Sequence, residues 1–333
     1  MQVPKAVRWA LGVACVVVLV VAAGIDANQS GSGADARAKL TLIAPAAAGG
    51  GWDLVARESQ QALRSAGIVN NVQVVNVPGA AGTIGLSQIS RLEGDPTTMM
   101  VTGTVMLGGI ARNESQIDLS DLTPIARLAE DFDVVAVPAD SPFRTIDELV
   151  EAWRADPEAM PIGGGSAGGV DHMIAAQLAR EAGIDPGQLR YAAYAGGGEL
   201  TINLLSTAPG TPGVGISGYN DFRDMLTEGR LRALMVVAPE RLAGLDVPTA
   251  VEAGYPEVDI VNWRGLVAPA GIDRAAQDEL IAITTEMVDT EHWKNVVDRN
   301  RWNETVLTGD EFGEFLRQEQ QRVNGILQDL GLA

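Results

Sequence analysis

Short apolar runs alternate with longer amphipathic stretches from residue 40 to the end of this chain. Apolar runs of roughly four to eight residues between glycines or prolines are typical of buried strands, and apolar residues spaced three and four apart are typical of helices. The pattern predicts strands at 40–44, 72–77, 98–102, 133–137, 161–163, 190–193, 214–216, 231–238 and 260–268. It predicts helices at 54–65, 84–92, 170–182, 200–205, 273–289 and 310–330, and one more that Thr145 and Glu148 begin as a capping pair.

Strands that alternate with helices indicate an α/β fold, and we expect its sheets to be mainly parallel. About ten strands over some 300 residues fit two lobes better than one sheet. Because ligands of open α/β sheets bind beyond the carboxyl ends of the strands, two facing lobes would hold a ligand in the cleft between them.

The first residues have the pattern of a targeting segment. Lys5 and Arg8 precede an apolar run, Ala10–Ala23, that has the length of a signal-peptide core and is short for a membrane-spanning helix, which needs ~20 residues. We expect residues 1–24 to be a signal peptide or an N-terminal anchor. Residues 25–39 are small, polar and rich in glycine and serine, so we expect a flexible spacer there. The protein would then be exported, either periplasmic or tethered to the outer face of the cytoplasmic membrane.

Charge and cysteine content narrow the possible functions. The net charge is −19, and such a surface repels nucleic acid and anionic membranes. The single cysteine, Cys15, lies in the apolar N-terminal run, so a mature chain would have no disulfide, cysteine nucleophile or cysteine zinc site. We expect neither a metal nor a cofactor. An acidic ligand would have to be attracted locally, for example by backbone N–H groups.

Four glycine-rich turns each follow a predicted strand and precede a predicted helix. Glycine lets the backbone approach a ligand closely, and a helix N-terminus carries partial positive charge, so such turns favour anions. The plainer interpretation is a set of tight turns with capped helices, with Asp53 as an N-cap or first-turn acid and Ser166 as another N-cap. The turns are Pro45–Asp53, Pro78–Gly85, Gly163–Gly169 and Tyr194–Glu199.

The candidate ligand contacts lie in these turns and at the end of one later strand. Tyr194 among them could offer its hydroxyl to a ligand or pack against its own turn. A bulky residue at Gly50 is expected to abolish binding without unfolding the protein. The candidates are Ala47, Gly49, Gly50, Gly51, Trp52, Asp53, Gly79, Ala80, Ala81, Gly82, Thr83, Ser166, Gly168, Gly169, Tyr194, Gly196, Gly197 and Ser217.

The third turn also matches two enzyme motifs. It satisfies G-x-G-x-x-G, but the acids at the right distance for a dinucleotide site, Glu181 and Asp185, lie at a helix end and in a turn. It also satisfies the G-x-S-x-G of serine hydrolases, with Ser166 as the nucleophile. His292 is the one distant histidine that could serve it, and His172 lies one to two turns into the helix that Ser166 precedes.

In their order and spacing the turns resemble those of the tripartite tricarboxylate transporter receptors, also called the Bug family. Pro45–Asp53 is similar to the family loop P-[FY]-x-P-G-G-G-[TS]-D, with Arg57 following, and Val75–Gly85 is similar to E-N-R-P-G-A-G-G-N-I-G. The resemblance covers the chain from about residue 40 to the C-terminus. Further similar segments are Phe143–Trp153, Gly168–His172, Ala193–Gly197, Val236–Val251 and Trp263–Gly271.

The resemblance implies a two-lobed periplasmic-binding-protein fold of type II, with a first lobe of 40–132 plus 250–333 and a second lobe of 133–249. It implies a receptor, and not an enzyme, that captures a small organic di- or tricarboxylate in the cleft. Loop backbone and ordered waters would bind the acid, rather than an arginine salt bridge. The partners would be two membrane subunits, one large and one small, and we expect a monomer. A serine hydrolase that uses Ser166 and a binding module of a sensory system are the alternatives.

The sequence departs from the family pattern at several positions. Trp52 stands where the family has threonine or serine, Val77 where it has arginine, and Ala195 where it has lysine. Ser206–Val214 replaces the usual G-G-Q-V-D, which changes the wall expected near Ser217. The identity of the ligand therefore does not carry over from the family.

Overall fold

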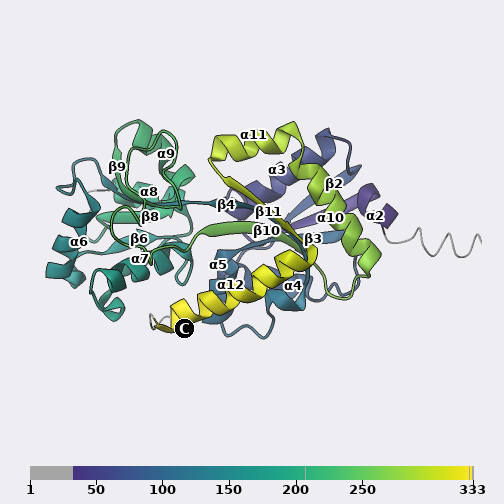
Figure 1. Ribbon diagram of the computed structural model, residues 1–333, viewed down its shortest axis with the longest axis horizontal. Helices are drawn as coiled ribbons and strands as arrows, with labels where there is room; N and C mark the ends of the chain where they lie inside the picture. The colour runs from purple at the N-terminus through teal and green to yellow at the C-terminus, as the bar shows by residue number, and fades with distance from the viewer. Residues whose placement is uncertain (1–32, 207, 330, 332–333) are drawn as a thin grey trace, which may run out of the picture.

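The computed structural model describes residues 33–206, 208–329 and 331, so the segment predicted as a signal peptide or anchor, residues 1–24, lies outside the described residues. Two lobes lie side by side along the long axis of the molecule (Figure 1). Each contains one sheet covered by helices. The structure confirms the predicted two-lobed α/β fold.

The first lobe is built on a six-stranded sheet with the order β11–β4–β10–β3–β1–β2. Its strands are β1 (Lys39–Ala44), β2 (Asn71–Asn76), β3 (Thr98–Gly103), β4 (Thr123–Asp131), β10 (Asn262–Ala268) and β11 (Asn303–Thr308). Its helices are α2 (Gly33–Ala38), α3 (Gly51–Ser65), α4 (Thr83–Ile89), α5 (Thr104–Arg112), α10 (Arg274–Val288), α11 (Glu291–Asn300) and α12 (Gly309–Asp329). None of the helices in the described residues is both long and apolar enough to cross a membrane.

The second lobe is built on a five-stranded sheet with the order β7–β6–β8–β5–β9. Its helix α6 begins as predicted, because the Thr145 hydroxyl accepts a hydrogen bond from the backbone N–H of Glu148. The strands are β5 (Asp133–Pro138), β6 (Ile162–Gly164), β7 (Tyr191–Ala193), β8 (Val214–Gly218) and β9 (Leu231–Val237). The helices are α6 (Ile146–Ala155), α7 (Val170–Glu181), α8 (Gly197–Leu204) and α9 (Tyr219–Thr227).

Both sheets are mixed, which corrects the expectation of mainly parallel sheets. β1 pairs in parallel with β2 and β3, and β6 with β7 and β8. β10 runs antiparallel to β3 and β4, and β5 runs antiparallel to β8 and β9. The reason is that β4, β5 and β10 belong to the segments that cross between the lobes. The parallel strands of each lobe end at the crossings. A strand that enters a lobe from a crossing begins at that end of the sheet, so it runs in the opposite direction.

The burial of strand β5 explains why its sequence is a continuous apolar run. Val135 and Val137 face one hydrophobic cluster, while Val134 and Ala136 face another. Both faces of this strand are buried, so its residues do not alternate between apolar and polar. β5 is therefore an interior strand of the second lobe, between β8 and β9.

Two crossings join the lobes. The first passes through Phe132, since β4 ends at Asp131 in one sheet and β5 begins at Asp133 in the other. The second is the segment that leads into β10. There the Thr104 hydroxyl donates to the carbonyl of Val261 (2.8 Å) and accepts from the N–H of Trp263 (3.1 Å). These two bonds fix the return crossing to the start of α5.

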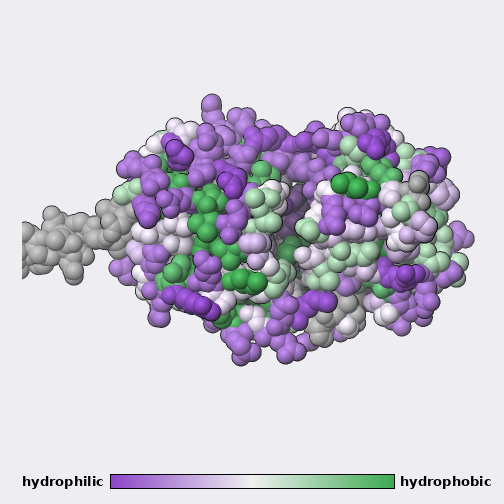
Figure 2. Space-filling model, turned by 180° about the vertical axis from the view of Figure 1, so that it is seen from behind, coloured by the Kyte–Doolittle hydropathy of each residue, from purple (hydrophilic) through white to green (hydrophobic). Residues whose placement is uncertain are grey.

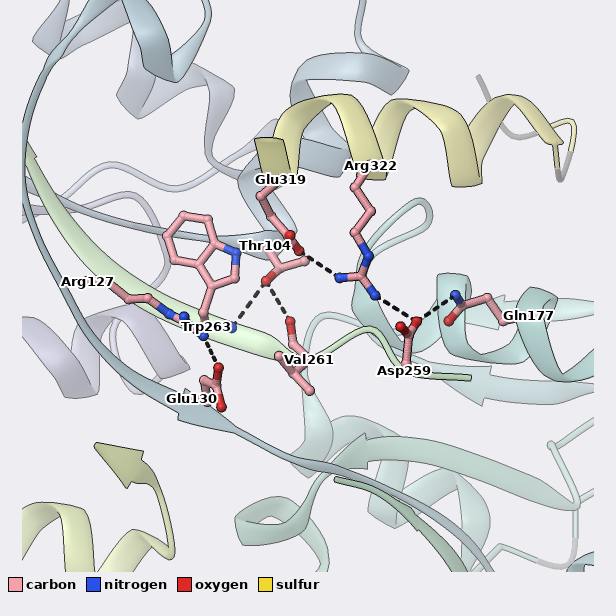
Figure 3. A network of polar contacts seen from close by, with 9 residues as sticks. All are labelled: Thr104, Arg127, Glu130, Gln177, Asp259, Val261, Trp263, Glu319 and Arg322. Carbon is pink, nitrogen blue, oxygen red and sulfur yellow. Dashed lines mark hydrogen bonds and ion pairs between the residues drawn. The ribbon is translucent and has the colours of Figure 1, made fainter. Parts of the chain in front are cut away.

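The C-terminal helix also reaches across this junction (Figure 3). Arg322 of α12 pairs with Asp259 at 2.7 Å, and Asp259 accepts a longer bond of 3.4 Å from Gln177 of α7. Tyr255, four residues earlier, donates to Asp147 of α6. Because residues 255–259 make these contacts to the second lobe, we propose that the chain re-enters the first lobe near Val261 and not at the expected residue 250.

The expected spacer, 25–39, is folded at its end, which corrects that boundary. Ala36 is buried and β1 begins at Lys39. The Arg37 guanidinium binds Glu286 of α10 at 2.8 Å and also contacts Glu279 on the same helix. The two carboxylates hold the chain against α10, so the first lobe includes residues before Leu40.

Candidate functional site

The four glycine turns lie where the two sheets face each other. Gly103, at the end of β3, pairs with Arg264 near the start of β10, so the carboxyl ends of the parallel strands in the first lobe lie at the crossings. Gly218, at the end of β8, pairs with Asp133, the first residue of β5. Figure 2 shows the surface hollowed between the two lobes. The turns therefore meet at one cleft, as the strand order predicts.

Helices that begin at this cleft share a type of N-terminus. In α3, α4, α5, α7, α8 and α9 the N-cap is a glycine, which has no side chain to accept the first N–H groups. By contrast, α6, α10 and α11 are capped by the side chains of Thr145, Asp273 and Thr290. Glycine caps leave N–H donors free to bind a ligand, and the helix dipoles favour an anion there.

Asp53 holds the first turn in place through hydrogen bonds. Its side chain is 3% exposed and accepts hydrogen bonds from the N–H of Gly49 (2.8 Å), from Arg57 Nε (2.9 Å) and from Asn76 Nδ2 (2.8 Å). Burial opposes ionisation, but the bonds from Arg57, Gly49 and Asn76 hold the pKa of Asp53 below its usual value. Asp53 is thus the predicted first-turn acid, and it fixes the loop that presents Gly49, Gly50 and Gly51.

Trp52 packs beneath the second turn. It is 8% exposed, and a Cβ added to Gly82 would lie 2.7 Å from its ring carbon Cζ3. A Cβ added to Gly103 would lie 3.3 Å from its Nε1. The large side chain therefore fills the space that two glycines leave, and its role in the described structure is to support the turns.

The second turn has a strained backbone. Gly79, Ala80, Ala81 and Gly82 all have positive φ, at 126°, 49°, 52° and 93°. Alanine rarely adopts this conformation, and such strain is typical of ligand-binding loops. The carbonyl of Ala80 accepts bonds from Asn113 Nδ2 and the Thr83 hydroxyl, which hold the turn in place.

The third turn touches the opposite lobe. A Cβ on Gly108 of α5 would lie only 2.1 Å from the carbonyl oxygen of Gly168, and a Cβ on Gly168 would lie 3.1 Å from Arg112 Cδ. The lobes are therefore in backbone contact on this side of the cleft. Glycine at both positions permits the approach.

We expect valine at Gly108 to push the lobes apart, because its Cβ overlaps the carbonyl of Gly168. The radius of gyration measured by small-angle X-ray scattering should rise, and ligand affinity should fall by at least about tenfold. Gly325→Val in α12 is the matched control, since a Cβ there meets nothing within 4 Å. An unchanged radius together with unchanged affinity in Gly108→Val would contradict a contact that closes the cleft.

The histidines and Ser166 are not arranged as a catalytic pair. The ring of His172 stacks on Tyr191 at 4.0 Å, and its Nδ1 accepts the N–H of Gly168. Burial and the nearby Arg112 lower the pKa of His172 to about 4. His292 binds Glu58 in the first lobe at 2.7 Å. Ser166 is exposed and is not an N-cap as expected, because α7 begins after Gly169.

The fourth turn contacts Asp221, which also binds Ser217 at the end of β8. Glu199 accepts the N–H of Ala195 and closes the turn, while Tyr194 is half-buried beside it. A Cβ on Gly197 would lie 2.1 Å from Asp221 Cγ. Ser217 is buried, and its hydroxyl donates to Asp221 Oδ2 at 2.7 Å. The expected residues Gly197 and Ser217 are thus brought together by an aspartate that the sequence did not single out.

Charged residues at the crossings were also missed. Arg264 Nη2 pairs with Asp131 Oδ2 at 2.6 Å, and both side chains are buried. A Cβ on Gly51 would lie 2.7 Å from Arg264 Nη1, so the guanidinium reaches the N-terminus of α3. Asp133 lies close to this pair, and Asp171 lies close to Asp133. Arginine therefore does stand at the cleft, although the family resemblance implied capture without one.

Three of these aspartates hold protons unusually tightly. Burial, followed by the charges of Asp171 and Asp131, raises the pKa of Asp133 well above its usual value. Burial likewise raises the pKa of Asp171 to about 7 and that of Asp221 above its ordinary range. Hydrogen bonds from the N–H of Gly165 and from Ser217 only partly offset this.

Stability should respond to pH through Asp171. Between about pH 4 and pH 7 the folded carboxyl keeps a proton that the unfolded chain releases, so stability falls as the pH rises through this window. The limiting slope is about 1.4 kcal/mol per pH unit. Because His172 titrates in the opposite direction below pH 6.5, the quantity to measure is the urea-unfolding free energy of the wild type minus that of Asp171→Asn. A difference that stays constant or rises with pH would contradict the protonated carboxyl.

Comparisons with known proteins agree with this geometry. A family model described as the tripartite tricarboxylate transporter family receptor matches residues 55–332. The chain is 24% identical to Protein BugT of Bordetella pertussis over 322 residues, which is 94% of this chain and 95% of that protein. A TctC solute-binding protein from Polaromonas is 25% identical and superposes with a TM-score of 0.68 over 87% of this chain and 98% of its own. MatC from Rhodopseudomonas palustris, with bound malate, is 21% identical and superposes with a TM-score of 0.73 over 87% and 98%. The matched family is a receptor family and the Polaromonas structure is a solute-binding protein, so the serine-hydrolase alternative is wrong.

Proposed function

Since the chain belongs to the tripartite tricarboxylate transporter receptor family, we propose that it captures a small organic carboxylate in the cleft between its lobes and delivers it to a tripartite uptake transporter. The receptor would work outside the cytoplasm. Its partners would be two membrane subunits, one large and one small. The protein would act as a monomer with a hinge at the two crossings.

The glycine N-caps are the observation that carries this proposal. Helices from both lobes begin at the cleft with N–H groups that no cap side chain accepts, and Arg264 adds a charge beside α3. A carboxylate placed there gains hydrogen bonds and favourable dipoles from both lobes. The malate bound by MatC, which has the same fold, is an acid of this kind.

Closure follows from the same geometry. An acid that contacts helix N-termini of both lobes binds the closed form better than the open form, and so shifts the population toward closure. The contact of Gly168 with Gly108 marks one edge of the closed arrangement. Closure would present a defined surface to the membrane subunits.

A thermal-shift screen of the purified protein against mono-, di- and tricarboxylates tests capture. We expect at least one acid to raise the melting temperature in a dose-dependent manner, since a ligand at about 100 times its Kd adds roughly 2.7 kcal/mol. Uptake of that acid into cells should then require both this chain and the two membrane subunits. If acids stabilise the protein but uptake is unchanged by its deletion, the transporter assignment fails and the sensory alternative gains.

A further inference from the structure

The end of α11 in the first lobe contacts α9 of the second lobe. Both helices lie on the opposite side of the crossing strands from α5 and α7 (Figure 1). Asn220 Nδ2, in the first turn of α9, donates to the carbonyl of Asn300 at 2.7 Å. Arg223 Nη1, about one turn further along α9, donates to the carbonyl of Arg299 at 2.8 Å. The lobes are therefore hydrogen-bonded to each other here, in addition to their backbone contact beside α5.

The carbonyls that accept these bonds are the last two of α11. The final C=O groups of a helix have no partner inside it. In α11 the carbonyls of Val297 and Asp298 accept from the N–H groups of Trp302 and Arg301, just beyond the helix. The next two carbonyls accept from the second lobe instead. A guanidinium at this end also complements the negative pole of the helix dipole.

Arg301 has a backbone conformation that glycine adopts more easily. It is the C-cap of α11, with φ 54° and ψ 32°, in the left-handed region. Helices commonly end on a glycine in this conformation, because a side chain is strained there. The arginine side chain instead crosses to the second lobe, where its Nη1 donates to the carbonyl of Ala243 at 2.6 Å. A strained residue that reaches the opposite lobe indicates a role beyond ending the helix.

Several contacts fix α11 to the first lobe. Glu58 of α3 binds His292 at 2.7 Å and also pairs with Arg299. Trp302, which follows the C-cap, is buried and lies beneath the guanidinium of Arg264. Because α11 is held in this way, a rotation of the lobes about the crossings breaks the three bonds to the second lobe and does not carry the helix along.

We propose that Asn220, Arg223 and Arg301 form an interlobe latch, which stabilises the closed receptor and sets how long a captured ligand stays bound. The inference rests on the proposed capture of a carboxylate and adds residues that control affinity through closure. They are positioning residues, since their bonds hold the lobes together. Loss of a bond that exists only in the closed form shifts the population toward the open form. The ligand then dissociates faster, while its association rate changes little.

Arg301→Gly separates the latch from an ordinary structural role. Glycine relieves the left-handed backbone, so the urea midpoint of unfolding should stay the same or rise. The bond to Ala243 is lost, so the acid that stabilises the wild type most should dissociate about three to ten times faster in stopped-flow measurements. Glu114→Gly is the matched control. Glu114 follows α5 with a φ of 48° and an exposed side chain, and its replacement should leave the dissociation rate unchanged.

A wild-type dissociation rate in Arg301→Gly would overturn the latch. Faster dissociation together with a lower unfolding midpoint would assign Arg301 to stability alone and overturn it as well. Arg223→Met tests the other half and should also speed dissociation about three- to tenfold. Its control is Arg230→Met, because Arg230 is exposed and pairs at 3.9 Å with Glu228 of its own lobe.

Small-angle X-ray scattering without ligand tests the latch independently of the proposed function. The double variant Arg223→Met with Arg301→Gly should have a larger radius of gyration than the wild type, because fewer molecules are closed. An unchanged radius would overturn the latch whether or not an acid binds. If no acid binds the wild type, the proposed function fails, and the radius still decides whether these bonds hold the lobes together.

Discussion

Replacing Arg264 with methionine is expected to lower the free energy of unfolding by about 3–5 kcal/mol. Asp131 would then be a buried carboxylate without its ion-pair partner, close to Asp133 and Asp221. The guanidinium also lies 5.3 Å over the ring of Trp302, a contact that the flexible methionine side chain only partly replaces. Urea unfolding at pH 7 measures the loss.

Two further variants separate this effect from a general loss of charge. Arg274→Met is the control, since Arg274 is 63% exposed and its pairs with Asp278 and Asp310 are on the surface. It should cost less than about 1 kcal/mol. The double variant Arg264→Met with Asp131→Leu should recover most of the stability, because it removes both charges. A loss below about 1 kcal/mol in Arg264→Met alone would contradict a stabilising role for the Arg264–Asp131 ion pair at the crossing.

Alanine at Trp52 is expected to cost about 3–5 kcal/mol and to weaken ligand binding as well. The cavity lies directly beneath Gly82 and Gly103, so the strained second turn loses its support. Trp153 of α6 is the matched control, because it is fully buried and its helix lies at the end of the second lobe that is remote from the first lobe (Figure 1). Trp153→Ala should destabilise the protein by a similar amount and leave affinity unchanged. Equal affinity in both variants would contradict the role assigned to Trp52.

Much of the fold could be predicted because its strands and caps are local signals. The Thr145 cap, the apolar run of β5 and the glycine turns are all present where the sequence places them. β4 could not be recognised, since Arg127, Glu130 and Asp131 interrupt its apolar pattern. Those charges are tolerated inside because Arg127 pairs with Glu130 and lies 4.4 Å over the ring of Phe315. Missing this crossing strand also led to the expectation of parallel sheets.

The glycine turns of the site were predictable for a similar reason, because a backbone site depends on residues that follow one another. The neighbouring aspartates of the cleft were not, because Asp131, Asp171 and Asp221 come from three separate segments. Asp171 and Asp221 each look like an ordinary acid in the first turn of a helix. The pairing of β8 with both β5 and β6 brings them to one place. Ser166 misled for the opposite reason, since its motif is local and the histidine it would need lies elsewhere.

A substitution at Gly51 gives the most direct test of the proposal that the ligand carboxylate binds at helix N-termini. A Cβ at Gly51 would lie 2.7 Å from Arg264 Nη1, whereas one at Gly50 would meet only the carbonyl of Ala47 at 3.2 Å and the Cβ of Ala46, so Gly51→Leu is sharper than a change at Gly50. Isothermal titration calorimetry should compare the wild type, Gly51→Leu and the control Gly325→Leu with the acid that stabilises the wild type most. We expect unchanged affinity in Gly325→Leu and a loss of at least about 100-fold in Gly51→Leu, with its folded circular-dichroism spectrum retained. Full affinity in a folded Gly51→Leu protein would place the carboxylate elsewhere and contradict binding at the helix N-termini.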